Sequence, residues 1–523
     1  MAVPPFSRRH FLAAGSALLA STTVPAWAEI FQTGAADDDV RVEVAEAALA
    51  RAASLGASYA DIRVNRFRRE SIATRERQVQ NVSRSTSRGF GLRVLVNGAW
   101  GFAATNRVEP AAARATAEQA VAIARANAAL AARKVVLADA DKVVTTWTSA
   151  FTRDPFEVPL DTKIAFLMKL NETALAVSGV TYVSSQVLFV DEQKYFASSE
   201  GSRITQRLVR TYPQFSTTAA DRAAGDFQTR AVVDRAQLVG YEYVDDYPWL
   251  QDAEKAGHEV VEKLRAKPVS PGRYDLVVDP SQLFLAIHES VGHSTELDRS
   301  LGWEANMAGT SFIKAADAGK LRFGAAIVNL VGDRTQAGGL ATTGFDDEGV
   351  KADRWHLVRD GTFVDWQTTR ELAPLVGQSR SHGCLHADSW SSVPFPRMPN
   401  VSLQPAPTDV SLEDLFSGIK RGLLIEGRGS SSIDQQRYNF QFGGAVVREI
   451  TNGKLGDMVK DAAYQSRTPD FWAACDGLGG PATYRLWGTS ADGKGEPGQI
   501  NAVSHGCPPA RFRQITVLNT ATV

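Results

Sequence analysis

The stretch His288-Glu289-Ser290-Val291-Gly292-His293 organises the C-terminal half of this chain. It follows the apolar run 283–287, which is typical of the buried face of a helix. Two imidazoles that flank a carboxylate are the groups that hold a zinc ion and activate a water molecule in hydrolytic enzymes. The stretch is therefore a candidate metal site, and the alternative is a buried helix whose polar side chains only cap or pair.

The spacing of the two histidines imposes a geometric condition. Residues four apart lie about 40° apart around a regular α-helix, whereas residues five apart lie about 140° apart. His288 and His293 are five apart, so they can face one ion only if the backbone leaves regular geometry. A π-bulge or an exit from the helix near Gly292 meets this condition, and a glycine makes either departure easier.

Length and composition indicate a soluble globular protein with two or three cores. The chain has 523 residues, of which 44% are hydrophobic and 22% are charged. Its 57 basic and 58 acidic residues nearly cancel, and no long basic run is interleaved with aromatic residues. We therefore expect no nucleic-acid partner.

The first 28 residues have the features of a twin-arginine export signal. Arg8-Arg9 precedes an apolar run that continues to about Val24, and Ala26-Trp27-Ala28 matches a signal-peptidase site. The run is too short and too rich in Ser and Thr for a stable membrane span. We predict a periplasmic protein, exported by the twin-arginine route after it has folded.

Cysteine usage does not indicate a structural zinc or redox motif. The chain has three cysteines, Cys384, Cys475 and Cys507, and none of them forms a Cys-x-x-Cys pair. One disulfide with one free thiol remains possible in an oxidising compartment.

Hydrophobic periodicity predicts an α+β fold with three sections after the signal peptide 1–28. The N-terminal α+β domain, 29–143, has expected helices at 39–55 and 110–133 and strands at 59–64, 74–82, 90–96 and 100–103. The middle α+β section, 144–270, has expected helices at 161–176 and 253–266 and strands at 182–190, 194–198 and 202–212. The C-terminal section, 271–523, is expected to be mainly antiparallel β and to carry the helix with the metal motif.

Several separated motifs resemble the TldD/PmbA family of metallopeptidases, and more closely its TldD branch. The resemblance covers nearly all of the mature chain. It rests on the segments 59–63, 89–94, 101–103, 288–293 with Glu296 and Asp298, 345–349, 396–400 and 493–499. Their joint order is more specific than any one of them.

The resemblance implies a zinc ion (Zn2+) held by His288 and His293, with Glu289 as general base. In the TldD branch a cysteine directly before a Gly-Lys pair completes the ligands. Here Asp492 precedes Gly493-Lys494, so that cysteine is absent.

Three interpretations of this difference remain open. Asp492 can bind zinc through oxygen, which gives a His₂-carboxylate site and is the preferred interpretation. Glu296, His505 or Cys507 can supply the missing ligand instead. In the third interpretation the site has lost tight zinc binding, and the chain serves as a non-catalytic partner subunit.

Two other polar clusters are candidates for a role near the site. His382 and His386 have ligand-like spacing, which indicates either a second metal or ordinary loop and cleft contacts. The acidic run 346–348 is expected to have a structural role near the site, with Arg397 as a buried partner for such a carboxylate.

The resemblance implies a zinc metallopeptidase that hydrolyses unfolded or extended peptides in a closed cleft by strand-like backbone pairing. It also implies a dimer, either a homodimer or a heterodimer with a TldE/PmbA-like subunit. The alternative function is a peptide-binding or partner subunit without catalytic activity.

Overall fold

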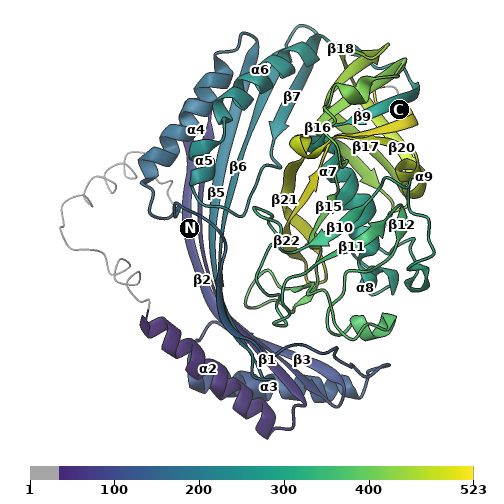
Figure 1. The fold of residues 1–523 in the computed structure, drawn as a ribbon. Helices are drawn as coiled ribbons and strands as arrows, with labels where there is room; N and C mark the ends of the chain where they lie inside the picture. Colours follow the sequence, from purple (N-terminus) through teal and green to yellow (C-terminus); the bar gives the residue numbers. More distant parts are fainter. Residues whose placement is uncertain (1–34, 522–523) are drawn as a thin grey trace, which may run out of the picture.

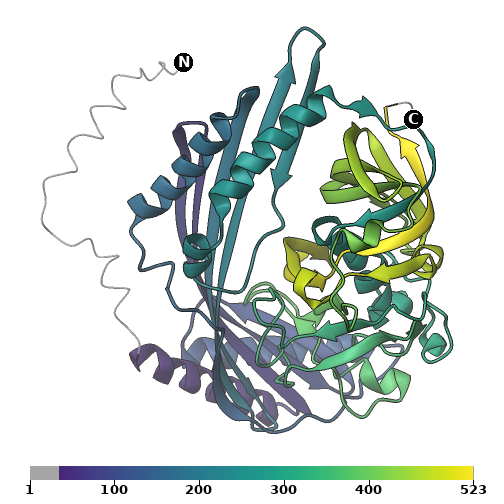
Figure 2. The same cartoon turned by 45° about the horizontal axis from the view of Figure 1, so that its top comes forward.

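The computed structural model describes residues 35–521, and the predicted export signal at 1–28 lies outside the described residues. The chain mixes helices and strands, which confirms the predicted α+β class. Figures 1 and 2 show two parts: a long curved sheet with helices, and a strand-rich C-terminal part that lies within the curve of the long strands. Among the helices of residues 35–521, none is long and apolar enough to cross a membrane.

A seven-stranded sheet joins the first two predicted sections. Its order is β3-β2-β1-β5-β6-β4, with β7 paired to β6, and β4–β6 is its parallel pair. The strands are β1 (Tyr59–Arg75), β2 (Gln78–Val96), β3 (Ala99–Thr105), β4 (Val144–Thr148), β5 (Val180–Ser198), β6 (Arg203–Asp221) and β7 (Asp226–Val232). Strands from both predicted sections therefore share one sheet.

The long strands are more continuous than predicted. The strand expected at 74–82 is a hairpin, because β1 ends at Arg75 and β2 begins at Gln78. The strands expected at 182–190 and 194–198 form the single strand β5. Charged residues inside the strands hid this continuity: Asp191 is buried and accepts a 3.0 Å hydrogen bond from Arg207 of β6.

Helices cover the two ends of this sheet (Figure 1). They are α2 (Ala35–Ser54), α3 (Pro110–Ala128), α4 (Leu160–Leu175), α5 (Glu242–Asp246) and α6 (Trp249–Arg265). Small residues allow α3 to approach β3 closely, since a Cβ at Gly101 would lie 2.0 Å from the carbonyl oxygen of Ala120. The close approach leaves room only for a small side chain at Ala124, whose Cβ would lie 2.8 Å from the same added atom.

The C-terminal part is built on an eight-stranded sheet of order β16-β9-β23-β19-β17-β18-β8, with β20 paired to β23. Its strands are β8 (Lys267–Pro268), β9 (Gly272–Val278), β16 (Arg421–Ile433), β17 (Asn439–Thr451), β18 (Lys454–Lys460), β19 (Ala462–Arg467), β20 (Cys475–Leu478) and β23 (Ala510–Asn519).

Smaller sheets and short helices complete this part. The strands are β10 (Leu330–Asp333), β11 (Arg354–Arg359), β12 (Thr362–Phe363) and β15 (Asn400–Leu403) in one sheet, β13 (Leu385–His386) with β14 (Phe395–Pro396), and β21 (Arg485–Lys494) with β22 (Gln499–Cys507). The helices are α7 (Pro280–Ile287), α8 (Leu297–Ser300) and α9 (Thr468–Ala473). α7 is entirely buried in the core of this part.

The acidic run 346–348 forms buried ion pairs between the two parts of the structure. The Asp347 carboxylate accepts a 2.7 Å hydrogen bond from Lys194 of β5, and both side chains are buried. Glu348 forms a 3.2 Å ion pair with Arg93 of β2. The run is therefore a buried structural element and not a solvated turn.

We predict that Asp347→Asn lowers stability far more than Asp141→Asn. Removal of one partner from a buried ion pair costs about 3–5 kcal/mol. Asp141 and Arg380 also join the two parts, at 2.7 Å, but their side chains are 69% and 60% exposed, so their pairing contributes little. Thermal unfolding midpoints measure both variants, and equal shifts would contradict the assigned role of Asp347.

Candidate metal centre

The histidine motif lies on a widened helical turn at the end of α7. The chain continues from α7 as a π-helical turn, His288–Gly292, and then as a 3₁₀ turn, His293–Thr295. The His293 N–H donates to the carbonyl of His288, five residues earlier, and the two ring centroids lie 4.6 Å apart. The predicted departure from α-helical geometry is confirmed.

Packing, not backbone freedom, explains the glycine in this turn. Gly292 has an ordinary helical φ of −52°. A Cβ at this position would lie only 2.4 Å from the sulfur of Met398. The carbonyl of Gly292 accepts a 2.5 Å hydrogen bond from Gln367, so the widened turn leaves no orphan acceptor there.

The turn brings both imidazoles to Asp492, which lies near the end of β21. Asp492 Oδ1 is 3.6 Å from His288 Nε2 and 3.5 Å from His293 Nε2. All three side chains are buried, and their nearest ligand atoms lie within 4.8 Å of one another. In residues 35–521 this is the one group of three or more His, Cys, Asp or Glu side chains close enough to hold a metal ion.

A chain of hydrogen bonds fixes the tautomer of His288. His505 Nδ1 lies 2.8 Å from the Val401 carbonyl, which can only accept, so this nitrogen carries the proton. Burial, with the neighbouring His288, lowers the pKa of His505 to about 3, so the ring is neutral and its Nε2 accepts. His288 Nδ1, 2.8 Å away, must therefore donate, so the neutral form of His288 has its lone pair on Nε2.

His293 is oriented in the same way by Glu296. Its Nδ1 lies 2.8 Å from Glu296 Oε1. Burial opposes ionisation of Glu296, but Arg299 and Lys494 outweigh it and hold the pKa of this carboxyl well below its usual range. The same Nδ1 also lies 3.0 Å from Arg299 Nη2, which can only donate. The shorter contact, to the carboxylate, assigns the proton to Nδ1, and the lone pair of Nε2 then points to Asp492. Burial, assisted by Arg299 and Arg437, lowers the pKa of His293, so this ring is also neutral.

Arg397 holds the other oxygen of Asp492. Its Nη2 lies 3.0 Å from Asp492 Oδ2 and 2.5 Å from the main-chain oxygen of the same residue. Burial raises the pKa of the Asp492 carboxyl, whereas the two imidazoles, when they are protonated, and Arg397, which is always charged, lower it. Arg397 was predicted to pair with a carboxylate of the run 346–348, but it pairs with Asp492.

The residues present fit a zinc ion. Two imidazole Nε2 atoms and one carboxylate oxygen converge, and when both rings are neutral their lone pairs face the carboxylate, so that a cation relieves the mutual repulsion. Ligands of a tetrahedral zinc lie roughly 3.4 Å apart, because each binds at 2.0–2.2 Å. The observed separations of 3.5 and 3.6 Å match this value.

The other predicted ligands lie outside this group of three. Glu296 and His505 each orient one histidine from behind, at its Nδ1. The sulfur of Cys507 is buried 3.9 Å from the Pro280 carbonyl. Cys384, Cys475 and Cys507 are all free and buried.

His382 and His386 do not converge on a second metal site. His382 lies between Asp353 and Asp365, at 2.9 and 3.0 Å, and stacks on Trp355. His386 faces Asp347 at 3.6 Å instead. The two side chains therefore make separate contacts with other segments.

Two residues near the centre were not found from the sequence. Lys494 pairs with Glu296 and lies 2.7 Å from Asp298. It could have been found, because it lies two residues after Asp492 and side chains two apart on a strand share a face. Arg437, which donates a 2.6 Å hydrogen bond to Glu289, carries no such local signal.

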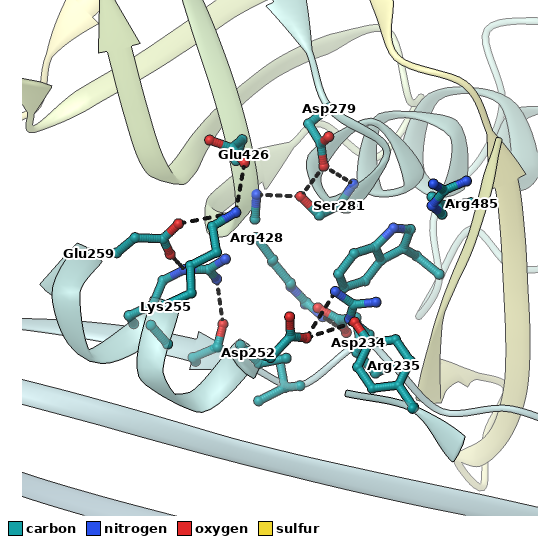
Figure 3. Close-up of a pocket in the computed structure, with 18 residues that line it drawn as sticks. Asp234, Arg235, Asp252, Lys255, Glu259, Asp279, Ser281, Glu426, Arg428 and Arg485 are labelled. Carbon is teal, nitrogen blue, oxygen red and sulfur yellow. Dashed lines mark hydrogen bonds and ion pairs between the residues drawn. The ribbon is translucent and has the colours of Figure 1, made fainter. Parts of the chain in front are cut away.

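A polar cavity of about 290 Å³ lies at the opposite end of α7, where α6 meets the C-terminal part (Figure 3). Five basic and five acidic side chains line it. Lys255 pairs with Glu426 at 3.6 Å and Arg428 with Asp234 at 3.3 Å across the boundary (Figure 3). The charges in the cavity therefore largely satisfy one another.

Comparison with known protein families identifies three consecutive matches. Domain 1 of the PmbA/TldA metallopeptidases matches residues 60–124, the central domain matches 153–267, and the C-terminal domain matches 271–519. The last of these contains the complete candidate metal centre.

Individual relatives agree with this result. A protein of Methanothermobacter thermautotrophicus named metalloprotease is 30% identical over 464 residues, which cover 88% of this chain and 96% of that protein. A zinc metalloprotease TldD homolog of Saccharolobus solfataricus is 22% identical over 89% of this chain and 98% of its own length. The crystal structure of TldE from Thermococcus kodakarensis has a similar fold, with a TM-score of 0.69 and 16% identity over 91% of this chain and 99% of that chain.

We predict that His505→Phe weakens zinc binding by roughly 10- to 100-fold, the usual effect of losing a hydrogen-bond partner behind a ligand. Phenylalanine cannot accept the proton of His288 Nδ1, whereas the amide oxygen of His505→Gln can. Competition with a chelating dye measures both affinities, and circular dichroism confirms folding. Wild-type affinity in the phenylalanine variant would contradict the orienting role.

Proposed function

The chain belongs to the PmbA/TldD family of metallopeptidases, and on this premise we propose that it is a zinc-dependent peptidase that hydrolyses unfolded or extended peptides. The observation that carries the proposal is the convergence of three ligand atoms, from His288, His293 and Asp492, with Glu289 next to His288 in the same helical turn. The histidine, glutamate and aspartate side chains supply the ligands and the base that such hydrolysis needs.

The chain's own residues divide the work of hydrolysis. A zinc ion bound by these three side chains supplies Lewis acidity for the attacking water and the scissile carbonyl. Glu289 accepts a proton from the water as its oxygen bonds to the carbonyl carbon. Glu289 then passes this proton to the amine nitrogen as the C–N bond breaks, which gives one carboxylic acid and one amine product.

The strand that carries Asp492 supports an extended substrate. β21 pairs with β22 along one edge, and at its other edge the described residues show a single bridge, between Gly488 and Arg235. An extended peptide can add to the remaining edge through main-chain hydrogen bonds. Such pairing selects unfolded chains with little dependence on their sequence.

We predict that Glu289→Gln keeps its zinc but loses hydrolysis by about 10²- to 10⁴-fold, because the amide cannot accept the proton. Asp492→Ala loses zinc itself, since two imidazoles remain to hold the ion. Metal analysis and digestion of an unstructured peptide, with and without chelator, separate the two effects. Full activity in Glu289→Gln would remove it from the mechanism, and a zinc-bound wild type without activity would favour a peptide-holding subunit.

We also propose that a second copy of the chain pairs with the free edge of β2. Within residues 35–521, β3 covers only Phe90–Val96 of this edge, and the residues from Gln78 to Thr86 are exposed on both faces. This segment contains a single charged residue, Arg84, so antiparallel self-pairing brings few like charges together. Long uncovered edges are templates for strand pairing.

Light scattering of the purified chain is expected to give twice the chain mass. Lysine at two exposed positions of this edge, Val79→Lys with Val82→Lys, is expected to give single chains. Val144→Lys, on the exposed edge strand β4, is the matched control and leaves the dimer intact. A monomeric wild type would contradict this proposal and leave the peptidase proposal untouched.

A further inference from the structure

The hairpin turn between β16 and β17 is held rigidly beside the candidate metal centre. The Asp434 carboxylate accepts the main-chain N–H groups of Tyr438 and Asn439, each at 2.9 Å. The carbonyl of Arg437 accepts a 2.7 Å hydrogen bond from Thr468. These contacts determine where the side chain of Arg437 begins.

Arg437 occupies a backbone conformation that does not suit an arginine. Its φ is +62°, in the left-handed region where a Cβ is crowded. Glycine, asparagine and aspartate are the usual residues at such turn positions. Backbone strain of this kind is typically kept where it serves a function.

The guanidinium of Arg437 reaches the proposed general base. Its Nη1 donates to Glu289 Oε2 at 2.6 Å, and its Nη2 donates to the Ala308 carbonyl at 3.0 Å. Its Nε is buried and has no hydrogen-bond partner within residues 35–521. A buried donor without a partner is unfavourable, so the side chain carries a second cost besides its backbone.

Arg437 bonds one oxygen of the Glu289 carboxylate, just as Arg397 bonds one side-chain oxygen of Asp492. Arg437 holds Oε2, and among the described residues it is the one side-chain partner of Glu289. The Glu289 side chain is 19% exposed, so without this contact it has room to rotate. In both carboxylates a guanidinium fixes one oxygen and leaves the other for chemistry.

We infer that Arg437 is a positioning residue: it holds Glu289 Oε2 so that Oε1 faces the attacking water. This inference rests on the peptidase activity proposed above. Arg437 has two unfavourable features, a strained backbone and an Nε without a partner, and its contact with Glu289 accounts for both. Arginine suits this role because its planar, permanently charged group fixes the direction of a carboxylate.

The test is Arg437→Gly, measured by kcat, KM, zinc content and thermal unfolding. We expect kcat to fall by roughly 10- to 100-fold, as for a catalytic group displaced by about 1 Å. KM and zinc content stay near wild type. The unfolding midpoint changes by less than about 2 °C, because relief of the backbone offsets the lost hydrogen bonds. Millimolar guanidinium is expected to restore part of kcat.

Asp461→Gly is the matched control, since Asp461 has a φ of +58° in the turn between β18 and β19 of the same sheet. This substitution relieves a similar backbone strain, and we expect it to leave kcat unchanged. Wild-type kcat in Arg437→Gly, or a loss that guanidinium does not restore and that follows a large drop in stability, overturns the inference. Wild-type hydrolysis and its loss in Glu289→Gln are measured alongside, so failure of the peptidase proposal is seen separately.

Discussion

One widened helical turn makes the candidate metal centre possible. The hydrogen bond from the His293 N–H to the His288 carbonyl spans five residues and places both rings on one side of the helix. Its surroundings are shaped to this turn: Met398 fills the space beside Gly292, and Trp472 donates a 2.9 Å hydrogen bond to Ser290. A regular helix would place the two imidazole rings about 140° apart, and Asp492 could then not approach both of them.

The charges around the centre are balanced before any ion enters. The two imidazoles are surrounded by four acidic and four basic side chains, namely Glu289, Glu296, Asp298 and Asp492 with Arg299, Arg397, Arg437 and Lys494. Each charge has a partner, which limits the cost of burying it. A divalent cation then gives the site an excess of positive charge, which suits a reaction that develops negative charge on oxygen.

Local sequence patterns predicted the features that are determined by residues close together in the sequence. The α+β class followed from periodicity, and the widened turn followed from the spacing of His288 and His293. Partners set by the register of distant segments could not be found in this way. Arg437 is 148 residues from Glu289, and Arg397 is 95 residues from Asp492. Buried charges within β5 concealed its length, because in the sequence they resemble a loop.

An aspartate at this position, instead of a cysteine, requires a hydrogen-bond donor for its second oxygen. A thiolate has one donor atom, whereas a carboxylate has a second oxygen that must be bonded when it is buried. Arg397 meets this need at 3.0 Å. The remaining thiols are inert: burial raises the pKa of Cys384 and of Cys475 to about 12, so both stay protonated. A zinc ion held only by nitrogen and oxygen, as proposed, would not lose a ligand to thiol oxidation.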